Sequence, residues 1–146
     1  MNTHPDFEEL LRLLEEQAVD YMIVGGYAVA WHGYPRFTKD LDIFFLASSD
    51  NVFRLRRALT TFGFAEEDLP TDAFLTPGNL LTFGVAPSRV DLINQIDGVD
   101  FNEAQPNVVR GQYGKTTANF IGFNDLIKNK LATPRSKDKA DIEELL

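Results

Sequence analysis

Apolar residues near the amino end recur at the spacing of an amphipathic helix. The repeating positions are Phe7, Leu10, Leu11, Leu14 and Ala18, and they share one face when the period is 3.6 residues. Asp6, with Glu9 three residues later, has the pattern of a capping box. We therefore predict an opening helix that is capped by Asp6 and packs its apolar face on a sheet.

Two short apolar runs follow and predict strands. Residues 21–24 form the first run, which ends at two glycines and precedes a predicted helix over residues 27–32. Residues 41–46 form the second run, which is interrupted only by Asp42. Apolar residues at helical spacing then predict a helix over residues 50–62. This order of strand, helix, strand and helix indicates a layered domain.

The second half of the chain continues the alternation. Residues 80–85 and 89–93 are apolar runs joined by a short segment with Pro87 and Ser88, and so short a connection predicts an antiparallel pair. Weaker patterns predict a short helix, a small strand and two terminal helices over residues 100–104, 117–121, 124–132 and 136–146. The expected fold class is α/β or α+β, with a mixed sheet flanked by helices and with C-terminal helices.

Composition favours one globular domain over residues 1–146. Apolar residues make up 44% of the 146 residues, and the twelve phenylalanines supply volume for a core. The absence of cysteine excludes disulfides, thiolate zinc sites and thiol catalysis. The amino end is polar and acidic, and no apolar run is long enough for a transmembrane helix. We therefore expect a cytoplasmic protein with no membrane contact.

The charge is unevenly distributed along the chain. The net charge is -8, and residues 1–100 hold 16 acidic and 7 basic side chains, whereas residues 101–146 hold 6 and 7. A body this acidic repels polyanions, which argues against a broad nucleic-acid-binding face. The basic segment over residues 124–140 is the place where phosphate would be attracted. The alternative is that this segment is an ordinary solvated helical face.

Two acidic residues at the second apolar run are candidate catalytic groups. Asp40 and Asp42 are two residues apart, so in a strand their side chains share a face with Cα atoms about 6 to 7 Å apart. Carboxylates entering a buried strand repel each other unless a cation or a basic group compensates them. The alternative is that Asp40 precedes the strand and Asp42 is solvated at a sheet edge.

A third acid, Asp91, lies in the apolar run of residues 89–93. If the two runs form neighbouring strands, Asp40, Asp42 and Asp91 converge, although the sequence does not establish that pairing. Such a site offers only oxygen ligands, the type that holds Mg²⁺ or Mn²⁺ and leaves positions for water and phosphate. The three aspartates are therefore the predicted metal ligands and catalytic residues.

Gly25 and Gly26 stand between a predicted strand and a predicted helix. Glycines here let the backbone approach an anion closely and direct amide groups at it. They are the predicted binding site for the phosphates of a nucleotide. The alternative is a tight turn that needs glycine for its own geometry.

Taken in order, Gly25-Gly26, Asp40-x-Asp42 and Asp91 form a pattern that resembles the nucleotidyltransferase superfamily of the polymerase-beta type. Residues 24–33 and 36–42 resemble the first half of a bacterial branch with abortive-infection toxins and lincosamide nucleotidyltransferases. The glycine pair departs from the Gly-Ser of minimal antitoxin-type transferases, so the chain is not placed in that subgroup.

The closing segment of that branch is similar to the tail of this chain, in which Lys130 is followed by Arg135-Ser-Lys-Asp138 and Asp141. Residues 64–80 and 97–116 match no part of the branch. The resemblance therefore covers both ends of the chain and, through Asp91, its middle.

The resemblance implies transfer of a nucleoside monophosphate from a nucleoside triphosphate, such as ATP, to an acceptor hydroxyl with release of pyrophosphate. It implies that Asp40 and Asp42 bind the metal on the triphosphate and that Asp91 joins them at a second metal. Arg36, Lys39 and Lys130 are the predicted basic contacts to the nucleotide, and solvation at the surface is the alternative for each.

The acceptor stays open between tRNA, a protein side chain and a small molecule. From the resemblance and the length of 146 residues, we expect no large helical domain for the acceptor, so that a homodimer or a partner protein would complete the cleft. The alternative function is a non-catalytic nucleotide-binding or toxin–antitoxin-associated protein that keeps the fold. A metal-dependent phosphohydrolase is disfavoured because such sites usually contain histidines, and this chain has only two.

Overall fold

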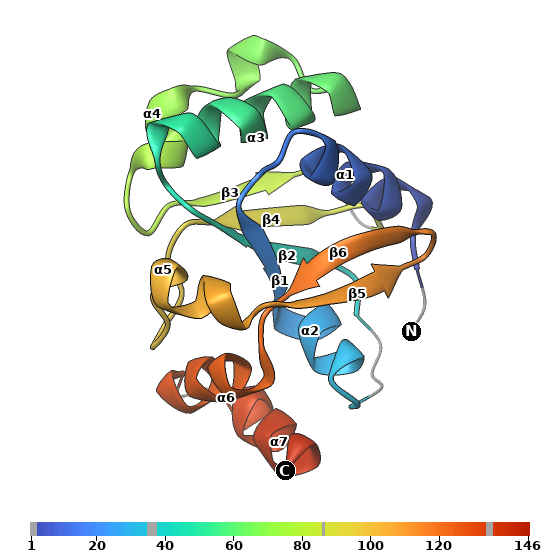
Figure 1. The fold of residues 1–146 in the computed structure, drawn as a ribbon, viewed down its shortest axis with the longest axis vertical. Coiled ribbons are helices and arrows are strands. Elements are labelled where there is room, and N and C mark those ends of the chain that lie inside the picture. Colours follow the sequence, from blue (N-terminus) through green and yellow to red (C-terminus); the bar gives the residue numbers. More distant parts are fainter. Residues whose placement is uncertain (1–2, 35–37, 86, 134–135) are drawn as a thin grey trace.

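A six-stranded mixed sheet forms the centre of the protein (Figure 1). The computed structural model describes residues 3–34, 38–85, 87–133 and 136–146. In chain order, the strands are β1 Tyr21–Val24, β2 Leu41–Phe45, β3 Leu80–Phe83, β4 Val90–Ile93, β5 Val109–Tyr113 and β6 Thr116–Phe120. Their order across the sheet is β3-β4-β2-β1-β6-β5. The pairs β1–β6 and β2–β4 are parallel, and the other neighbours are antiparallel.

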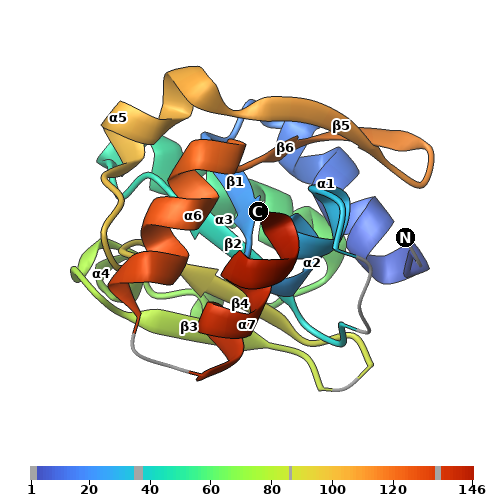
Figure 2. The ribbon, with the colours of Figure 1, turned by 90° about the horizontal axis from the view of Figure 1, so that it is seen from below.

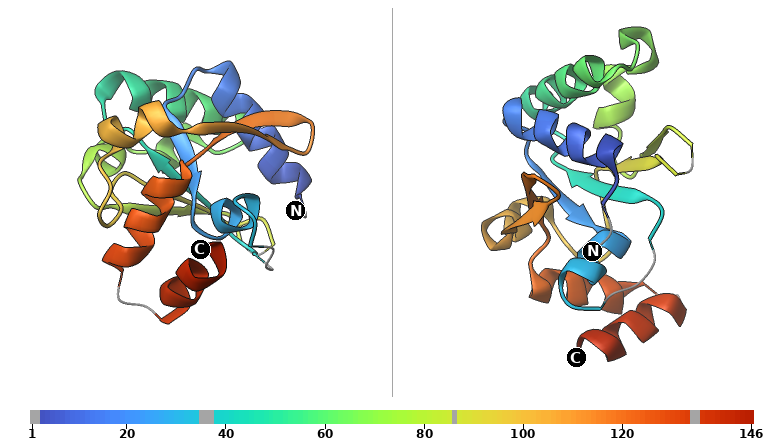
Figure 3. Two further views of the ribbon diagram at one scale, coloured as in Figure 1. Left: turned by 60° about the horizontal axis from the view of Figure 1, so that its bottom comes forward. Right: turned by 90° about the vertical axis from the view of Figure 1, so that its right-hand side faces the viewer.

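Helices cover both faces of this sheet. The described helices are α1 Pro5–Glu16, α2 Gly25–Trp31, α3 Ser49–Phe62, α4 Thr71–Leu75, α5 Phe101–Ala104, α6 Phe123–Ala132 and α7 Ser136–Leu145. Figures 1 and 2 show α1 and α3 on one side of the sheet and α6 and α7 on the other. The side view of Figure 3 separates these two layers, with the red terminal helices farthest from the green α3. No helix among the described ranges is long and apolar enough to cross a membrane.

Alternation along the central strands divides the core into two clusters. In β2, Ile43 and Phe45 pack in the cluster under α1 and α3, whereas Phe44 packs in the cluster toward α2, α5 and α6. Because side chains two residues apart in a strand share a face, Asp42 lies on the same side of the sheet as Phe44. The strand therefore directs Asp42 toward α2 and α6, while its apolar neighbours anchor it.

Most predicted elements are present, with shifts of one to three residues at their ends, and the predicted antiparallel pair is β3–β4. The predicted cap of α1 is wrong, because Nδ1 of His4 accepts a hydrogen bond from the amide of Asp6 and His4 is the cap. Gly25 and Gly26 form the first turn of α2 instead of a separate turn before it. α4 and β5 are elements outside the prediction, since each has only five residues and the apolar pattern of β5 is interrupted by Arg110, Gly111 and Gln112.

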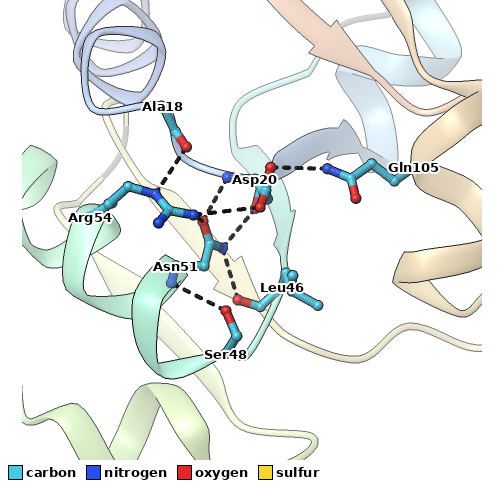
Figure 4. Close-up of polar contacts among 7 residues, drawn as sticks. All are labelled: Ala18, Asp20, Leu46, Ser48, Asn51, Arg54 and Gln105. Atoms are coloured by element: carbon cyan, nitrogen blue, oxygen red, sulfur yellow. Dashed lines mark hydrogen bonds and ion pairs between the residues drawn. The ribbon is translucent and has the colours of Figure 1, made fainter.

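A buried asparagine fixes the start of α3 against the two central strands (Figure 4). Asn51 is fully buried, and its side-chain amide donates to the carbonyl oxygens of Asp20 and Leu46 at 2.9 and 2.8 Å. Its Oδ1 accepts from the amide of Asp20, and Oγ of Ser48 caps the helix through the amide of Asn51. Because Asp20 precedes β1 and Leu46 follows β2, this network holds both strand ends in place.

Candidate active site

A cavity of about 340 Å³ opens between the sheet and α6. Its wall includes Asp42 from β2, Asp91 from β4 and Gly25 from the first turn of α2. Lys130 of α6 and Thr133, which follows that helix, complete the wall opposite the strands. Residues separated by more than one hundred positions in the chain thus meet at one cavity.

Asp42 and Asp91 are direct partners in the parallel pair β2–β4. The two acid-bearing runs are therefore neighbouring strands, as the convergence of the aspartates requires. β2 lies between β4 and β1 in the sheet, so the reading of Asp42 as a residue of a sheet edge is wrong. Asp40 does precede the strand, which begins at Leu41, and it is not part of the cavity wall.

Arg89 joins the acidic residues of the two strands. Its Nε and Nη2 donate to Oδ1 and Oδ2 of Asp91 at 3.1 and 3.2 Å, and its Nε lies 3.9 Å from Oδ2 of Asp40. The hydrogen bonds to Asp91, together with the charges of Asp91 and Asp40, raise the pKa of Arg89 above its ordinary value. Arg89 is thus a basic group that compensates Asp91 and Asp40.

Arg89 was not among the predicted site residues, although the sequence contains the signal that places it there. It precedes Asp91 by two positions, as Asp40 precedes Asp42, so each of the two residues lies directly before the first residue of its strand. The backbone bond from the amide of Leu41 to the carbonyl oxygen of Arg89, 3.1 Å long, brings Asp40 and Arg89 side by side. Recognising the pair required knowledge that the strands are neighbours.

The donor set at the cavity is of the type that suits a hard divalent cation. Asp42 and Asp91 offer carboxylate oxygens, which Mg²⁺ and Mn²⁺ prefer. Among the described residues, no three acidic or histidine side chains are arranged closely enough to hold a metal ion. The guanidinium of Arg89 lies where a cation would balance Asp91 and Asp40. The oxygen donors of Asp42 and Asp91 therefore fit a cation in their chemistry, and Arg89 lies beside Asp91.

Gly25 approaches the carboxylate of Asp42 so closely that no side chain fits between them. Its φ is +66°, and a β-carbon built on it would overlap the carboxyl group of Asp42. Gly25 belongs to the cavity wall beside that carboxylate. Gly26 is buried within the same helix and is not in the cavity wall.

Lys130 is buried and held by two acids of α7. Only 4% of its side chain is exposed, and Nζ lies 2.8 Å from Oδ1 of Asp138 and 3.3 Å from Oδ2 of Asp141. The hydroxyl of Thr133 donates to Oδ2 of Asp138 at 2.6 Å. The reading of Lys130 as a solvated surface residue is therefore wrong, and this ion cluster joins α6 to α7 beside the cavity.

The other two predicted basic contacts do not belong to the described cavity wall. Lys39 is exposed next to Asp40. Arg36 lies outside the described residues. Their predicted contacts with a nucleotide stay predictions.

Comparison with known proteins identifies the fold. No family model and no curated protein matches the sequence. The solution structure of the antibiotic-resistance factor ANT(2'')-Ia is similar, with a TM-score of 0.59, 13% identity, and coverage of 96% of this chain and 80% of that one. The crystal structure of ANT(2'')-Ia in complex with adenylyl-2''-tobramycin gives 0.56 and 13%, covering 95% and 84%.

A third similar structure is the lincosamide antibiotic adenylyltransferase LnuA with lincomycin bound. Its TM-score is 0.54 at 17% identity, and the match covers 99% of this chain and 98% of LnuA. At such low identity, the likeness establishes the fold alone. The chain therefore has the nucleotidyltransferase-type fold that the sequence pattern implied, and the expected mixed sheet with flanking and C-terminal helices is confirmed.

Proposed function

We propose that this protein is a metal-dependent nucleotidyltransferase that transfers a nucleoside monophosphate from a nucleoside triphosphate to a hydroxyl of a small molecule. The observation that carries the proposal is the direct pairing of Asp42 with Asp91 at a cavity whose opposite wall holds Lys130. The carboxylates of Asp42 and Asp91 can bind a cation, and the ammonium group of Lys130 on the other wall can bind a phosphate. This is the arrangement that in-line phosphoryl chemistry needs.

Asp42 and Asp91, with Asp40 beside them, would hold Mg²⁺ or Mn²⁺. The bound cation would activate the acceptor hydroxyl and neutralise charge on the departing pyrophosphate. Gly25, which belongs to the cavity wall, would present its main chain to a phosphate beside the carboxylate of Asp42. Gly26, which is buried behind Gly25 in the same turn, would act by letting that turn stay compact.

Lys130 would contact the polyphosphate from the other wall of the cavity. An ammonium group has three N–H donors; Nζ donates to Oδ1 of Asp138 at 2.8 Å and lies 3.3 Å from Oδ2 of Asp141. A donor that Asp138 does not use would contact a phosphate oxygen. Burial between two carboxylates also fixes the side chain, so little rotamer entropy is lost when the nucleotide binds.

A small-molecule acceptor is favoured over tRNA or a protein side chain. The similar structures were determined with adenylyl-2''-tobramycin and with lincomycin, both small molecules. The acidic net charge of -8 also disfavours association with a polyanion such as tRNA. Cations or neutral molecules with free hydroxyls are therefore the first acceptors to test.

One observation favours a second candidate function, that of a non-catalytic nucleotide-binding protein. Arg89 already binds Asp91, and three ligands are not assembled among the described residues. A protein that had lost catalysis would retain the fold with an ion pair in place of the cation. The experiment below separates the two.

The test is transfer of label from a triphosphate labelled at the α-phosphate, with the same triphosphate labelled at the γ-phosphate as a comparison. The four common triphosphates are incubated with Mg²⁺ or Mn²⁺ and with aminoglycosides, lincosamides or total tRNA. We expect α-label and no γ-label on an antibiotic-like acceptor. Transfer of γ-label would point to a kinase, and nucleotide binding without any transfer would support the non-catalytic alternative.

Matched variants test whether Asp91 and Asp40 take part in the transfer reaction. Asp91→Asn and Asp40→Asn should each lower turnover by about two orders of magnitude or more, since each removes a charge that positions a cation. Asp68→Asn, an exposed aspartate outside the cavity wall, is the control and should keep full turnover. Equal transfer by all four proteins would refute the assigned site.

A further inference from the structure

The side chain of Asp91 has little capacity left for another ligand. Its Oδ1 accepts from the hydroxyl of Thr82 at 2.8 Å and from Nε of Arg89 at 3.1 Å, and its Oδ2 accepts from Nη2 of Arg89 at 3.2 Å. A carboxylate oxygen has two lone pairs, so Oδ1 is fully engaged. A cation that used Asp91 in this state would lie within a few ångströms of a guanidinium and would be repelled by it.

The two members of this ion pair differ in mobility. The side chain of Asp91 is 13% exposed, whereas that of Arg89 is 42% exposed. Asp91 is also fixed by Thr82 on the neighbouring strand β3. Arg89 is therefore the partner that can leave, since its guanidinium has open solvent to move into.

The backbone next to Arg89 is anchored, so its departure is a side-chain movement. Oγ of Ser88 donates to Oδ2 of Asp6 at 3.0 Å and lies 3.2 Å from Nε2 of His4. These contacts tie the residue before Arg89 to the amino end of α1. The start of β4 can therefore stay in place while the guanidinium turns away from Asp91.

We propose that Arg89 is an internal counterion that competes with the divalent cation for Asp91 and is released to the polyphosphate when a nucleotide binds. The inference rests on the proposed function, because it requires a cation at Asp42 and Asp91. A triphosphate brings several negative charges to the cavity and gives the displaced guanidinium a bidentate partner. Cation and nucleotide then strengthen each other's binding. The nucleotide takes Arg89 away from Asp91, which the cation needs, and the cation takes Asp91 away from Arg89, which the nucleotide needs.

The proposal predicts two changes in the Mn²⁺ affinity of Arg89→Gln, one without a nucleotide and one with it. Without a nucleotide, the variant should bind Mn²⁺ up to about fivefold more tightly than the wild type, the upper end for loss of a competing, partly exposed ion pair. A non-transferable α,β-methylene triphosphate should tighten Mn²⁺ binding in the wild type by about tenfold. In the variant, this enhancement should largely disappear. Arg89→Lys, which keeps the charge without the planar fork, should be intermediate.

The readouts are the Kd of Mn²⁺ by electron paramagnetic resonance and the melting temperature of the metal-free protein, neither of which depends on turnover. Arg110→Gln is the matched control, since Arg110 is another half-exposed arginine on a carboxylate, 2.7 Å from Glu15 of α1, and that carboxylate is outside the cavity wall whereas Asp91 belongs to it. It should leave the Kd of Mn²⁺ unchanged. Arg89→Gln should also lower the melting temperature without metal, and Mn²⁺ should restore it.

Two results would overturn the proposal. If the wild type binds Mn²⁺ and Arg89→Gln binds it equally or more weakly, Arg89 is not a competitor, and the proposed nucleotidyltransferase function is unaffected. If the wild type binds no Mn²⁺ with or without the triphosphate analogue, the metal-dependent function is refuted. The proposed competition between Arg89 and the cation is then refuted too. The Kd of the wild type therefore tells the two failures apart.

Discussion

Gly25 leaves the space that the carboxylate of Asp42 occupies. The residue has a φ of +66°, and an added β-carbon would overlap the carboxyl group. The first turn of α2 and the second residue of β2 are thus fitted to each other across the antiparallel pair β1–β2, in which Val24 is the partner of Asp42. A glycine that looks like a turn residue in the sequence therefore sets the position of an acid in the cavity.

Gly25→Ala should lower the free energy of unfolding and displace Asp42. A positive φ costs a non-glycine residue about 1–2 kcal/mol, and the overlap adds to this. Urea unfolding measures the first effect and the Kd of Mn²⁺ the second. Gly63→Ala is the control, since Gly63 has a φ of +134° with open space around it. It should lose stability and keep its affinity for Mn²⁺. An unchanged Kd of Mn²⁺ in both variants would show that Gly25 does not set the position of Asp42 for cation binding.

Mg²⁺ or Mn²⁺ together with a nucleoside triphosphate should raise the melting temperature of the wild type. A ligand at one hundred times its Kd stabilises the folded state by about 2.7 kcal/mol. Asp42→Asn should remove this response because it removes a ligand charge from the cavity wall. Asp68→Asn should retain the response. A full ligand-induced shift in Asp42→Asn would exclude Asp42 as a ligand.

Lys130→Met should destabilise the fold strongly. It would leave Asp138 and Asp141 buried without the cation that lies 2.8 and 3.3 Å from them. Breaking a buried ion pair by removing one partner costs about 3–5 kcal/mol. The measurement is urea unfolding monitored by the fluorescence of Trp31. A loss below about 1 kcal/mol, the range of surface pairs, would contradict the burial of this cluster.

The triple variant K130M/D138N/D141N separates stability from binding at the same site. Removing all three charges together should recover much of the lost stability, since replacing a whole buried ion group is often nearly neutral. Its affinity for the triphosphate analogue should still fall by about 1–3 kcal/mol, the range for a lost charge-assisted contact. Retained affinity would make Lys130 a structural residue only.

Asn51→Ala should destabilise the protein without changing the cavity. The substitution removes the partner of the amide of Asp20 and of the carbonyl oxygen of Leu46, both partly buried, while the carbonyl oxygen of Asp20 keeps its bond from the amide of Leu46. Each buried group left unsatisfied costs about 1–3 kcal/mol. Ser48→Ala removes only the helix cap and should cost about 1 kcal/mol. Equal losses in thermal unfolding of the two variants would show that the bonds to the strand ends contribute nothing.

The sequence determined the local structure of most elements because local structure follows from the period of apolar positions. The run of residues 21–24 gave β1 with the predicted bounds, and the helical spacing before Gly63 gave α3. β5 escaped prediction because Arg110, Gly111 and Gln112 interrupt its apolar pattern. The two residues between β5 and β6, Gly114 and Lys115, are a hairpin signal that would have revealed it.

Only the tertiary structure decided which of the candidate residues meet. Spacing along the chain put Asp40 and Asp42 in one run and Asp91 in another. It does not specify which strands are neighbours in the sheet. The pairing of Asp42 with Asp91 arises because burial of both faces of β2 fixes its register between β1 and β4. The ion pair of Arg89 and the burial of Lys130 depend in the same way on contacts between distant segments, which periodicity along a single chain does not encode.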